Sequence, residues 1–219
     1  MNYKNKVKAL ILARKGSQRI KNKNLLMING VPIVKKALLQ AIEVFGVSNV
    51  VISSDDERIL GIFKFFPKKL IFNKRPKRFS GHKVKSETVL RYLIKKYEIK
   101  EKFIIILQPT SPFRDIRDIK KMTQIIIHNN LNTLHSANKY KIKKKIRRKV
   151  FIFKSKKNRV PDSSKKYSYN GSIYIFKQNY FFNRNSIYEK IPNLYLTKNK
   201  NSLDIDNLKD LKGLNYKLF

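Results

Sequence analysis

The chain has 219 residues, of which 42% are apolar and 11% aromatic. This apolar content excludes an intrinsically disordered protein and suffices for a substantial core, so we expect a single domain over residues 1–219. No apolar run reaches the roughly 18 residues needed to cross a bilayer, which excludes an integral membrane protein. There are no cysteines, so disulfides and thiolate metal sites are excluded as well. We expect a cytoplasmic globular protein.

The net charge is +37, from 51 lysines and arginines against 14 acidic residues. Such a charge is typical of nucleic-acid-binding proteins. However, Lys, Ile and Asn, whose codons are the richest in A and T, together supply 87 residues, whereas Ala supplies five. Drift of the encoding genome therefore explains much of the charge, and nucleic-acid binding stays the alternative. In either case the charge attracts phosphorylated ligands.

Apolar runs alternate with amphipathic segments along the chain. Each run is nearly all apolar, as is usual for parallel strands that are buried on both faces. The alternation predicts an α/β fold, a mostly parallel sheet with helices on both faces. The predicted strands span 7–13, 49–55, 103–107 and 171–176. The predicted helices span 56–66, 85–98, 115–129 and 207–216, and a further helix begins near Pro32.

Polar clusters follow three of the predicted strands, at 14–24, 53–55 and 108–114. Ligands of open α/β sheets bind outside the carboxyl ends of the strands. The sequence therefore predicts a binding site that these three clusters share.

The pattern changes after residue 138. From Lys139 to Lys166 there are 14 basic residues and one acid, and residues 150–153 alternate as in a strand or hairpin. We interpret 139–168 as a small, basic, β-rich insertion that forms a flap. A solvated basic loop is an equally open interpretation.

Residues 13–24 form a Gly-Ser loop, with several cations, directly after the first strand. Backbone N–H groups and cations together suit a triphosphate. The loop lacks the second Gly and the Lys-Ser/Thr pair of a P-loop. An ordinary surface turn is the alternative.

Asp204 and Asp206 are two residues apart, so an extended segment places both carboxylates on one side. Paired carboxylates can hold Mg²⁺, which also binds substrate phosphates. The alternative is that Asp206 caps the last helix and Asp204 is merely exposed.

Residues 107–114 end a strand with two prolines, which fix the directions of Gln108, Thr110 and Ser111. Amide and hydroxyl groups held in this way recognise a base or a sugar by hydrogen bonds. A stiff loop that serves only the fold is the alternative.

Five segments occur in the order seen in acylneuraminate cytidylyltransferases, and the chain resembles that family over most of its length. The segments are ALILARKGSQRIKNKN, RPKR (75–78), LQPTSPFRD, YNGSIYIF and SLDID. The resemblance implies a Rossmann-like nucleotidyltransferase fold and the coupling of CTP to a nine-carbon 2-keto (nonulosonic) sugar acid. The products would be a CMP-sugar and pyrophosphate. It further implies a need for Mg²⁺ and a homodimer, with 139–168 as the dimerisation flap. The alternatives are a basic nucleic-acid-binding protein and a member of the same family that keeps the fold but has lost the activity.

The resemblance also implies roles for individual residues. The expected nucleotide-binding residues are Ala13, Arg14, Lys23, Asn24, Arg75, Ser86 and Gln108. The expected sugar-binding residues are Gln108, Thr110, Tyr167, Asn170 and Gly171. Asp204 and Asp206 match the metal-binding pair, and the expected catalytic set is Arg14, Lys23, Gln108 and Asp206.

Four departures from the family pattern bear on the substrate. His82 stands where an acid is common, and we interpret it as a surface substitution. Gln18 stands where Lys is common, which removes one phosphate contact, and the spacing from Arg159 to Asn170 is longer. Residues 139–158 match no family pattern, so the cation for the sugar carboxylate could be any of several lysines there. Sialic, legionaminic and pseudaminic acids therefore all stay open as the sugar.

Overall fold

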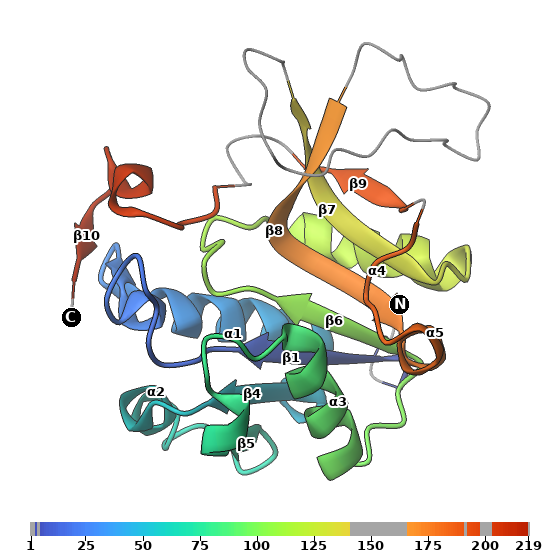
Figure 1. The fold of residues 1–219 in the computed structure, drawn as a ribbon, viewed down its shortest axis with the longest axis horizontal. Coiled ribbons are helices and arrows are strands. Elements are labelled where there is room, and N and C mark those ends of the chain that lie inside the picture. Colours follow the sequence, from blue (N-terminus) through green and yellow to red (C-terminus); the bar gives the residue numbers. More distant parts are fainter. Residues whose placement is uncertain (1–2, 4, 141–165, 191, 198–202, 219) are drawn as a thin grey trace.

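The computed structural model describes residues 3, 5–140, 166–190, 192–197 and 203–218. A seven-stranded sheet in the order β5-β4-β1-β6-β8-β7-β9 runs through the described part of the chain (Figure 1). Its strands are β1 (Val7–Leu12), β4 (Val50–Ser54), β5 (Ile71–Lys74), β6 (Phe103–Leu107), β7 (Thr133–Tyr140), β8 (Lys166–Lys177) and β9 (Leu194–Leu196). The α-helices are α1 (Ile33–Phe45), α2 (Glu57–Ile62), α3 (Ser86–Lys96), α4 (Ile116–His128) and α5 (Gln178–Arg184).

The strands β5, β4, β1 and β6 are parallel to their neighbours, as the unbroken apolar runs predict. Leu10 of β1 pairs with Val51 of β4 on one side and with Ile106 of β6 on the other. Every residue of β4 and β6 is buried. The carboxyl ends of the central strands therefore lie next to one another at one edge of the sheet.

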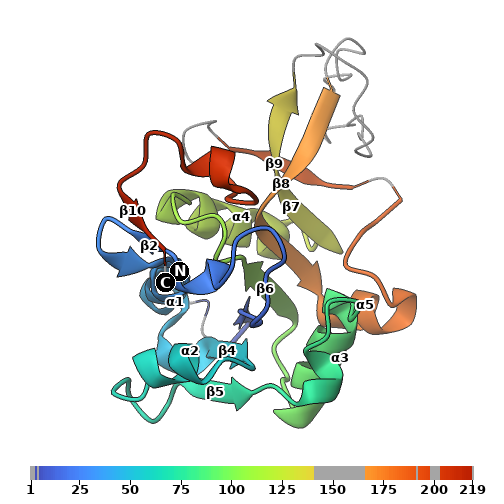
Figure 2. The ribbon, with the colours of Figure 1, turned by 60° about the vertical axis from the view of Figure 1, so that its left-hand side comes forward.

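Side chains alternate along each strand, so both faces of the sheet carry apolar side chains. Helices cover both of these faces. Ala9 and Ile11 of β1 pack in one core cluster together with residues of α1, α2 and α4. Leu10 between them packs in the other cluster, with residues of α3 and α5. Figure 2 shows α3 and α5 next to each other on their face of the sheet. The predicted fold class is thus confirmed.

Beyond β6 the sheet becomes partly antiparallel. β8 pairs antiparallel with both β6 and β7, and β7 pairs parallel with the short strand β9. Strands β5, β7 and β9 were not predicted. The sequence of β7 is Thr-Leu-His-Ser-Ala-Asn-Lys-Tyr, and it is buried over 133–137. Its polar residues give no apolar pattern from which a buried strand could be predicted.

The predicted helix over 207–216 is wrong. Leu208–Leu211 form one short 3₁₀ helix, capped at its start by a capping box between Asn207 and Asp210. Gly213 then takes a positive φ of 79°, and Tyr216–Lys217 form β10. β10 pairs with β2 (Met27–Ile28) in a separate three-stranded sheet whose other member is β3 (Val31–Pro32). Strand pairing with β2 therefore overrides the weak helical pattern.

The predicted flap lies largely outside the described residues, which omit 141–165. Its two ends belong to β7 and β8, where Lys139 pairs with Tyr167 and Tyr140 with Lys166. Within the part of the chain that the structure describes, no helix is long and apolar enough to span a membrane.

Candidate active site

A cavity of about 330 Å³ opens at the carboxyl ends of β1 and β6. Its walls come from the loop after β1, the segment around the start of α3, the loop after β6, and residues of β8 and beyond. The expected site residues that line it are Arg14, Lys23, Asn24, Arg75, Ser86, Gln108 and Thr110. Two of the three predicted clusters, 14–24 and 108–114, therefore meet at this cavity. Residues 53–55 do not line it, but Ser53 and Ser54 hold Arg75 and Ala13 from behind.

Backbone and side-chain hydrogen bonds fix the loop after β1. Ala13 is fully buried, its N–H donates to the carbonyl of Ser53 at 2.9 Å, and its own carbonyl accepts from the Ser54 hydroxyl at 2.6 Å. The Asn24 side-chain amide donates to the carbonyl of Arg14 at 2.8 Å. These bonds connect the loop to β4 and leave the side chain of Arg14 on the cavity wall.

The Asp204–Asp206 segment lies against the loop after β6. Ile205 is fully buried, and its N–H donates to the carbonyl of Thr110 at 2.8 Å. Burial raises the pKa of the Asp204 carboxyl, against a hydrogen bond with Thr110 that lowers it. The Oδ1 atom of Asp204 is buried without a hydrogen-bond partner among the described residues. Asp204 is therefore not the exposed residue of the helix-cap alternative, and the cap itself is Asn207.

Asp206 has the opposite surroundings. Its Oδ1 accepts from Lys23 Nζ at 3.1 Å and its Oδ2 accepts from Arg19 at 3.0 Å. Burial alone would raise the pKa of Asp206, but the hydrogen bond and charge of Lys23, together with Arg19, hold it below its usual range. The carboxylate of Asp206 is thus ionised. It lies next to the cavity wall, which Lys23 and Arg19 line and which Asp204 and Asp206 do not.

An acidic pair of this kind fits a divalent cation. The buried Oδ1 of Asp204 is a ligand atom that the described residues leave without a partner. Mg²⁺ is usually held by one or two carboxylates, with waters and substrate phosphates as the other ligands. Groups of three or more acidic, His or Cys side chains in metal-binding proximity are absent from the described residues. Any cation held here would therefore need further ligands from water or from a substrate.

Arg75 is only 5% exposed, although it lines the cavity. Its Nε donates to the Ser53 hydroxyl at 3.1 Å and its terminal NH2 group to the Ser53 carbonyl at 2.8 Å. Burial lowers the pKa of Arg75 to about 10, so it keeps its positive charge at neutral pH. Ser86 is the first residue of α3 and is exposed on the same wall, whereas His82 is exposed and does not line the cavity.

The loop after β6 is held by Arg114, which is 4% exposed. Arg114 donates to the Gln108 carbonyl, to the carbonyl and hydroxyl of Ser172 at 3.0 Å each, and to Gln40 Oε1 at 2.9 Å. Burial lowers the pKa of Arg114 to about 9, against the charge of Asp204. Arg114 thereby fixes Gln108 and Thr110 beside the cavity.

Tyr167, Asn170 and Gly171 lie on β8 and do not line the cavity. The Asn170 amide oxygen accepts from Ser136, and its nitrogen donates to Asn138 and Thr197. Gly171 has a φ of 76°, and a Cβ atom there would lie 2.9 Å from Asp204 Oδ2. The structure thus places Asn170 within the sheet and Gly171 behind the carboxylate pair.

One side of the cavity was not predicted from the sequence: Tyr174, Ile187 and Tyr188 form an aromatic and aliphatic wall. The ring of the fully buried His135 packs against Tyr174 and Tyr188, with centroids 5.1 and 5.4 Å apart. Tyr174 belongs to the segment YNGSIYIF, which could have indicated it. Ile187 and Tyr188 follow α5 without any motif, so the sequence offers no signal for them. Arg19 and Phe79 also line the cavity and were not predicted.

The fold is the nucleotidyltransferase fold that the sequence predicts. A solved structure of CMP:2-keto-3-deoxy-manno-octonic acid synthetase complexed with CTP matches this fold with a TM-score of 0.69. The match covers 94% of this chain and 95% of that one at 17% sequence identity, and at this identity it concerns the fold alone.

Residues 8–214 match the family model described as cytidylyltransferase, and the chain belongs to this family. It is 26% identical over 220 residues to the N-acylneuraminate cytidylyltransferase of Escherichia coli O18:K1:H7, covering 94% of this chain and 51% of that protein. It thus spans about half the length of that relative. It is 28% identical over 213 residues to the CMP-N,N'-diacetyllegionaminic acid synthase of Campylobacter jejuni, covering 92% and 90% of the two chains.

Proposed function

We propose that this protein transfers the cytidylyl group of CTP to the anomeric hydroxyl of a nonulosonic acid. A bond forms between the hydroxyl oxygen and the α-phosphorus, the bond to the bridging oxygen of pyrophosphate breaks, and the hydroxyl proton is lost. The observation that supports this most is the contact between Lys23 and Asp206. These residues are 183 positions apart, and the fold joins a cation of the cavity wall to a carboxylate directly behind it.

The nucleotide half of the cavity suits a triphosphate. Arg14, Lys23 and Arg75 line it, and the negative charge of a triphosphate is stabilised by such cations. Arg75 is held by Ser53, so its guanidinium is positioned in advance and needs little rearrangement when an anion binds. Preorganised charge of this kind stabilises the negative charge that develops on the phosphate oxygens.

The other half of the cavity suits a sugar acid. Gln108 and Thr110 offer hydrogen-bonding groups between the cations and the tyrosines. Tyr174, Ile187 and Tyr188 supply an apolar and aromatic wall, a surface that packs against sugar rings and acyl substituents. The relatives named above act on acids of this class according to their names.

Asp204 and Asp206 would hold Mg²⁺. When bound, the cation would supply Lewis-acid stabilisation of the phosphate charge. Asp204 offers its unpartnered oxygen, and Asp206 is ionised. Lys23 would orient Asp206 from the other side.

Pyrophosphate release tests this function. The wild-type chain, with Mg²⁺ and a mixture of nonulosonic acids, should release pyrophosphate from CTP and far less from ATP, GTP or UTP. Asp206→Asn should lower turnover by about 100-fold or more, because a metal ligand and an ionised carboxylate are lost together. Asp115→Asn is the control, since Asn also caps helices well and Asp115, which caps α4 and pairs with Arg117, does not line the cavity. Wild-type turnover in Asp206→Asn would contradict the assignment of the metal site.

A further inference from the structure

Arg19 and Lys23 share the carboxylate of Asp206, but the two cations are held very differently. The Lys23 side chain is 13% exposed and the Arg19 side chain is 62% exposed. An exposed ion pair contributes little to stability, because water and salt screen it. Of the two contacts, the one with Arg19 therefore costs less free energy to break.

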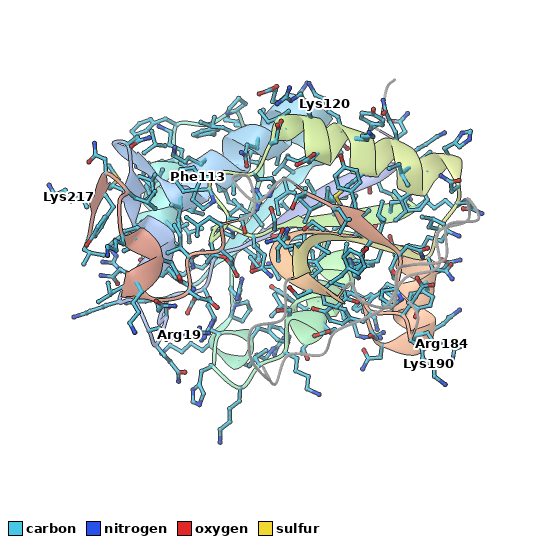
Figure 3. All side chains as sticks on the ribbon, turned by 90° about the horizontal axis from the view of Figure 1, so that it is seen from above. Arg19, Phe113, Lys120, Arg184, Lys190 and Lys217 are labelled. Carbon is cyan, nitrogen blue, oxygen red and sulfur yellow. The ribbon has the colours of Figure 1, made fainter. Side chains whose placement is uncertain are left out.

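Arg19 also faces the cavity, which it lines together with Arg14 and Lys23. It lies at the molecular edge on the side of the C-terminal segment (Figure 3). The loop that contains it has positive φ at Gly16 and at Asn22, so turns on both sides delimit it. A guanidinium on such a loop can reach either Asp206 or an anion in the cavity.

We propose that Arg19 is a phosphate-binding residue that exchanges partners. It pairs with Asp206 in this structure, and it moves to the polyphosphate when a divalent cation takes Asp206. This inference rests on the proposed function, because it assumes that a nucleotide polyphosphate and a cation bind at this cavity.

Charge supplies the physical reason for the exchange. A divalent cation on Asp206 would neutralise the carboxylate and would lie within a few ångströms of the guanidinium, so the two positive charges would repel each other. Phosphate oxygens nearby offer the planar Arg19 fork a bidentate partner instead. The same group would thus oppose the binding of the cation alone and favour the binding of the nucleotide with its cation.

Because of this double role, removing the Arg19 charge should change two binding affinities in opposite directions. In the first, Mn²⁺ alone is titrated and the free ion is followed by electron paramagnetic resonance. In the second, CTP is titrated calorimetrically at saturating Mg²⁺ without an acceptor, so that no turnover occurs. We expect Arg19→Gln to bind Mn²⁺ about three- to tenfold more tightly and CTP about five- to twentyfold more weakly.

Two variants serve as controls. Lys21→Gln removes one charge from the same loop, at an exposed position outside the cavity lining, and should leave both affinities near wild type. Arg19→Lys keeps the charge and should recover most of both affinities. An unchanged or weakened affinity of Arg19→Gln for Mn²⁺, or an unchanged affinity for CTP, would overturn the exchange. If the wild-type chain binds no CTP, the proposed function fails and this inference fails with it.

Discussion

Asp204 and Asp206 are separated by one residue, yet their surroundings differ strongly. Asp204 is partly buried beside Thr110, and this burial raises its pKa, whereas Lys23 and Arg19 lower the pKa of Asp206. The buried Ile205 between them anchors the segment to the loop after β6. One carboxylate thus has an unused oxygen and the other a fixed charge, a combination that suits a shared cation better than two equivalent surface acids would.

Gly171 is the residue that allows this arrangement. We expect Gly171→Ala to destabilise the protein by about 1–3 kcal/mol, because its φ is positive and the new Cβ would lie 2.9 Å from Asp204 Oδ2. The displaced carboxylate should also lower turnover. Chemical denaturation and pyrophosphate release measure the two effects. Gly61→Ala in α2 is the control, since the new Cβ would meet nothing within 4 Å. This substitution should change stability by less than about 1 kcal/mol. Equal effects of the two substitutions would contradict the close packing behind Asp204.

Gln108 lies on the cavity wall between the cations and the tyrosines, and its backbone is fixed by Arg114. We expect Gln108→Ala to lower kcat/KM by tens- to thousands-fold, on the scale of one or two hydrogen bonds to a polar or charged ligand. The melting temperature of Gln108→Ala should stay near wild type, because Arg114 binds the backbone carbonyl of residue 108, which the substitution keeps. Gln124→Ala, on the exposed side of α4, is the control. An unchanged kcat/KM would remove Gln108 from the site.

At the scale of elements, the strand β7 places a buried histidine behind the aromatic side of the cavity. His135 Nε2 lies 2.8 Å from the carbonyl of Ile187, and Nδ1 has no partner among the described residues. Burial lowers the pKa of His135 to about 4, against the hydrogen bond of its ring to the Ile187 carbonyl, which raises it. The neutral ring therefore supports Tyr174 and Tyr188 at neutral pH.

This burial predicts a loss of stability in mild acid. Below pH 6.5 the unfolded chain binds a proton at His135 while the folded chain does not, until the pH approaches 4. The free energy of unfolding should therefore fall by about 2 kcal/mol between pH 7.5 and 5 through this residue alone. Urea denaturation across that range measures it.

Two variants separate this effect from other titrations. His135→Phe should be less stable than wild type at pH 7.5 but should lose less stability on acidification, because the titrating group is gone. His128→Gln, at the exposed end of α4, should keep the wild-type dependence on pH. An equal acid-induced loss in His135→Phe and wild type would show that His135 is not the group responsible.

The elements differ in how well the sequence predicts them, and burial explains the difference. β1, β4 and β6 are buried on both faces, so their sequences are unbroken apolar runs that predict both the strand and its parallel pairing. β7 buries Thr133, His135 and Ser136, polar residues that find hydrogen bonds only after the chain has folded. Periodicity cannot indicate such a strand.

The site shows the same contrast. Arg14, Lys23, Arg75 and Gln108 stand in loops that directly follow predicted strands or belong to quoted motifs, and the structure brings all four to one cavity. The contact of Asp206 with Arg19 depends on how the C-terminal segment folds back over 187 positions, which no local pattern encodes. The placement of Ile187 and Tyr188 likewise depends on tertiary packing beside β8.

At the scale of the whole molecule, the charge of +37 has a local consequence at the cavity. Arg14, Arg19, Lys23 and Arg75 line it, and Glu87 is the one acid among the described lining residues. Binding of CTP should therefore weaken as salt rises, but only moderately, because few ion contacts are made. Polynucleotide binding, the alternative function, would instead fall by orders of magnitude between about 50 and 200 mM salt.

The central claim is that the cavity joins CTP to a sugar acid, and analysis of the products tests it most directly. The wild-type chain is incubated with CTP, Mg²⁺ and one of three acids at a time: sialic, legionaminic or pseudaminic acid. The products are then separated and identified by mass spectrometry. We predict a CMP-linked acid and pyrophosphate in equal amounts from at least one acid, and none from Asp206→Asn. Pyrophosphate without a CMP-linked acid, or no product from any of the three acids with a folded protein, would contradict the account.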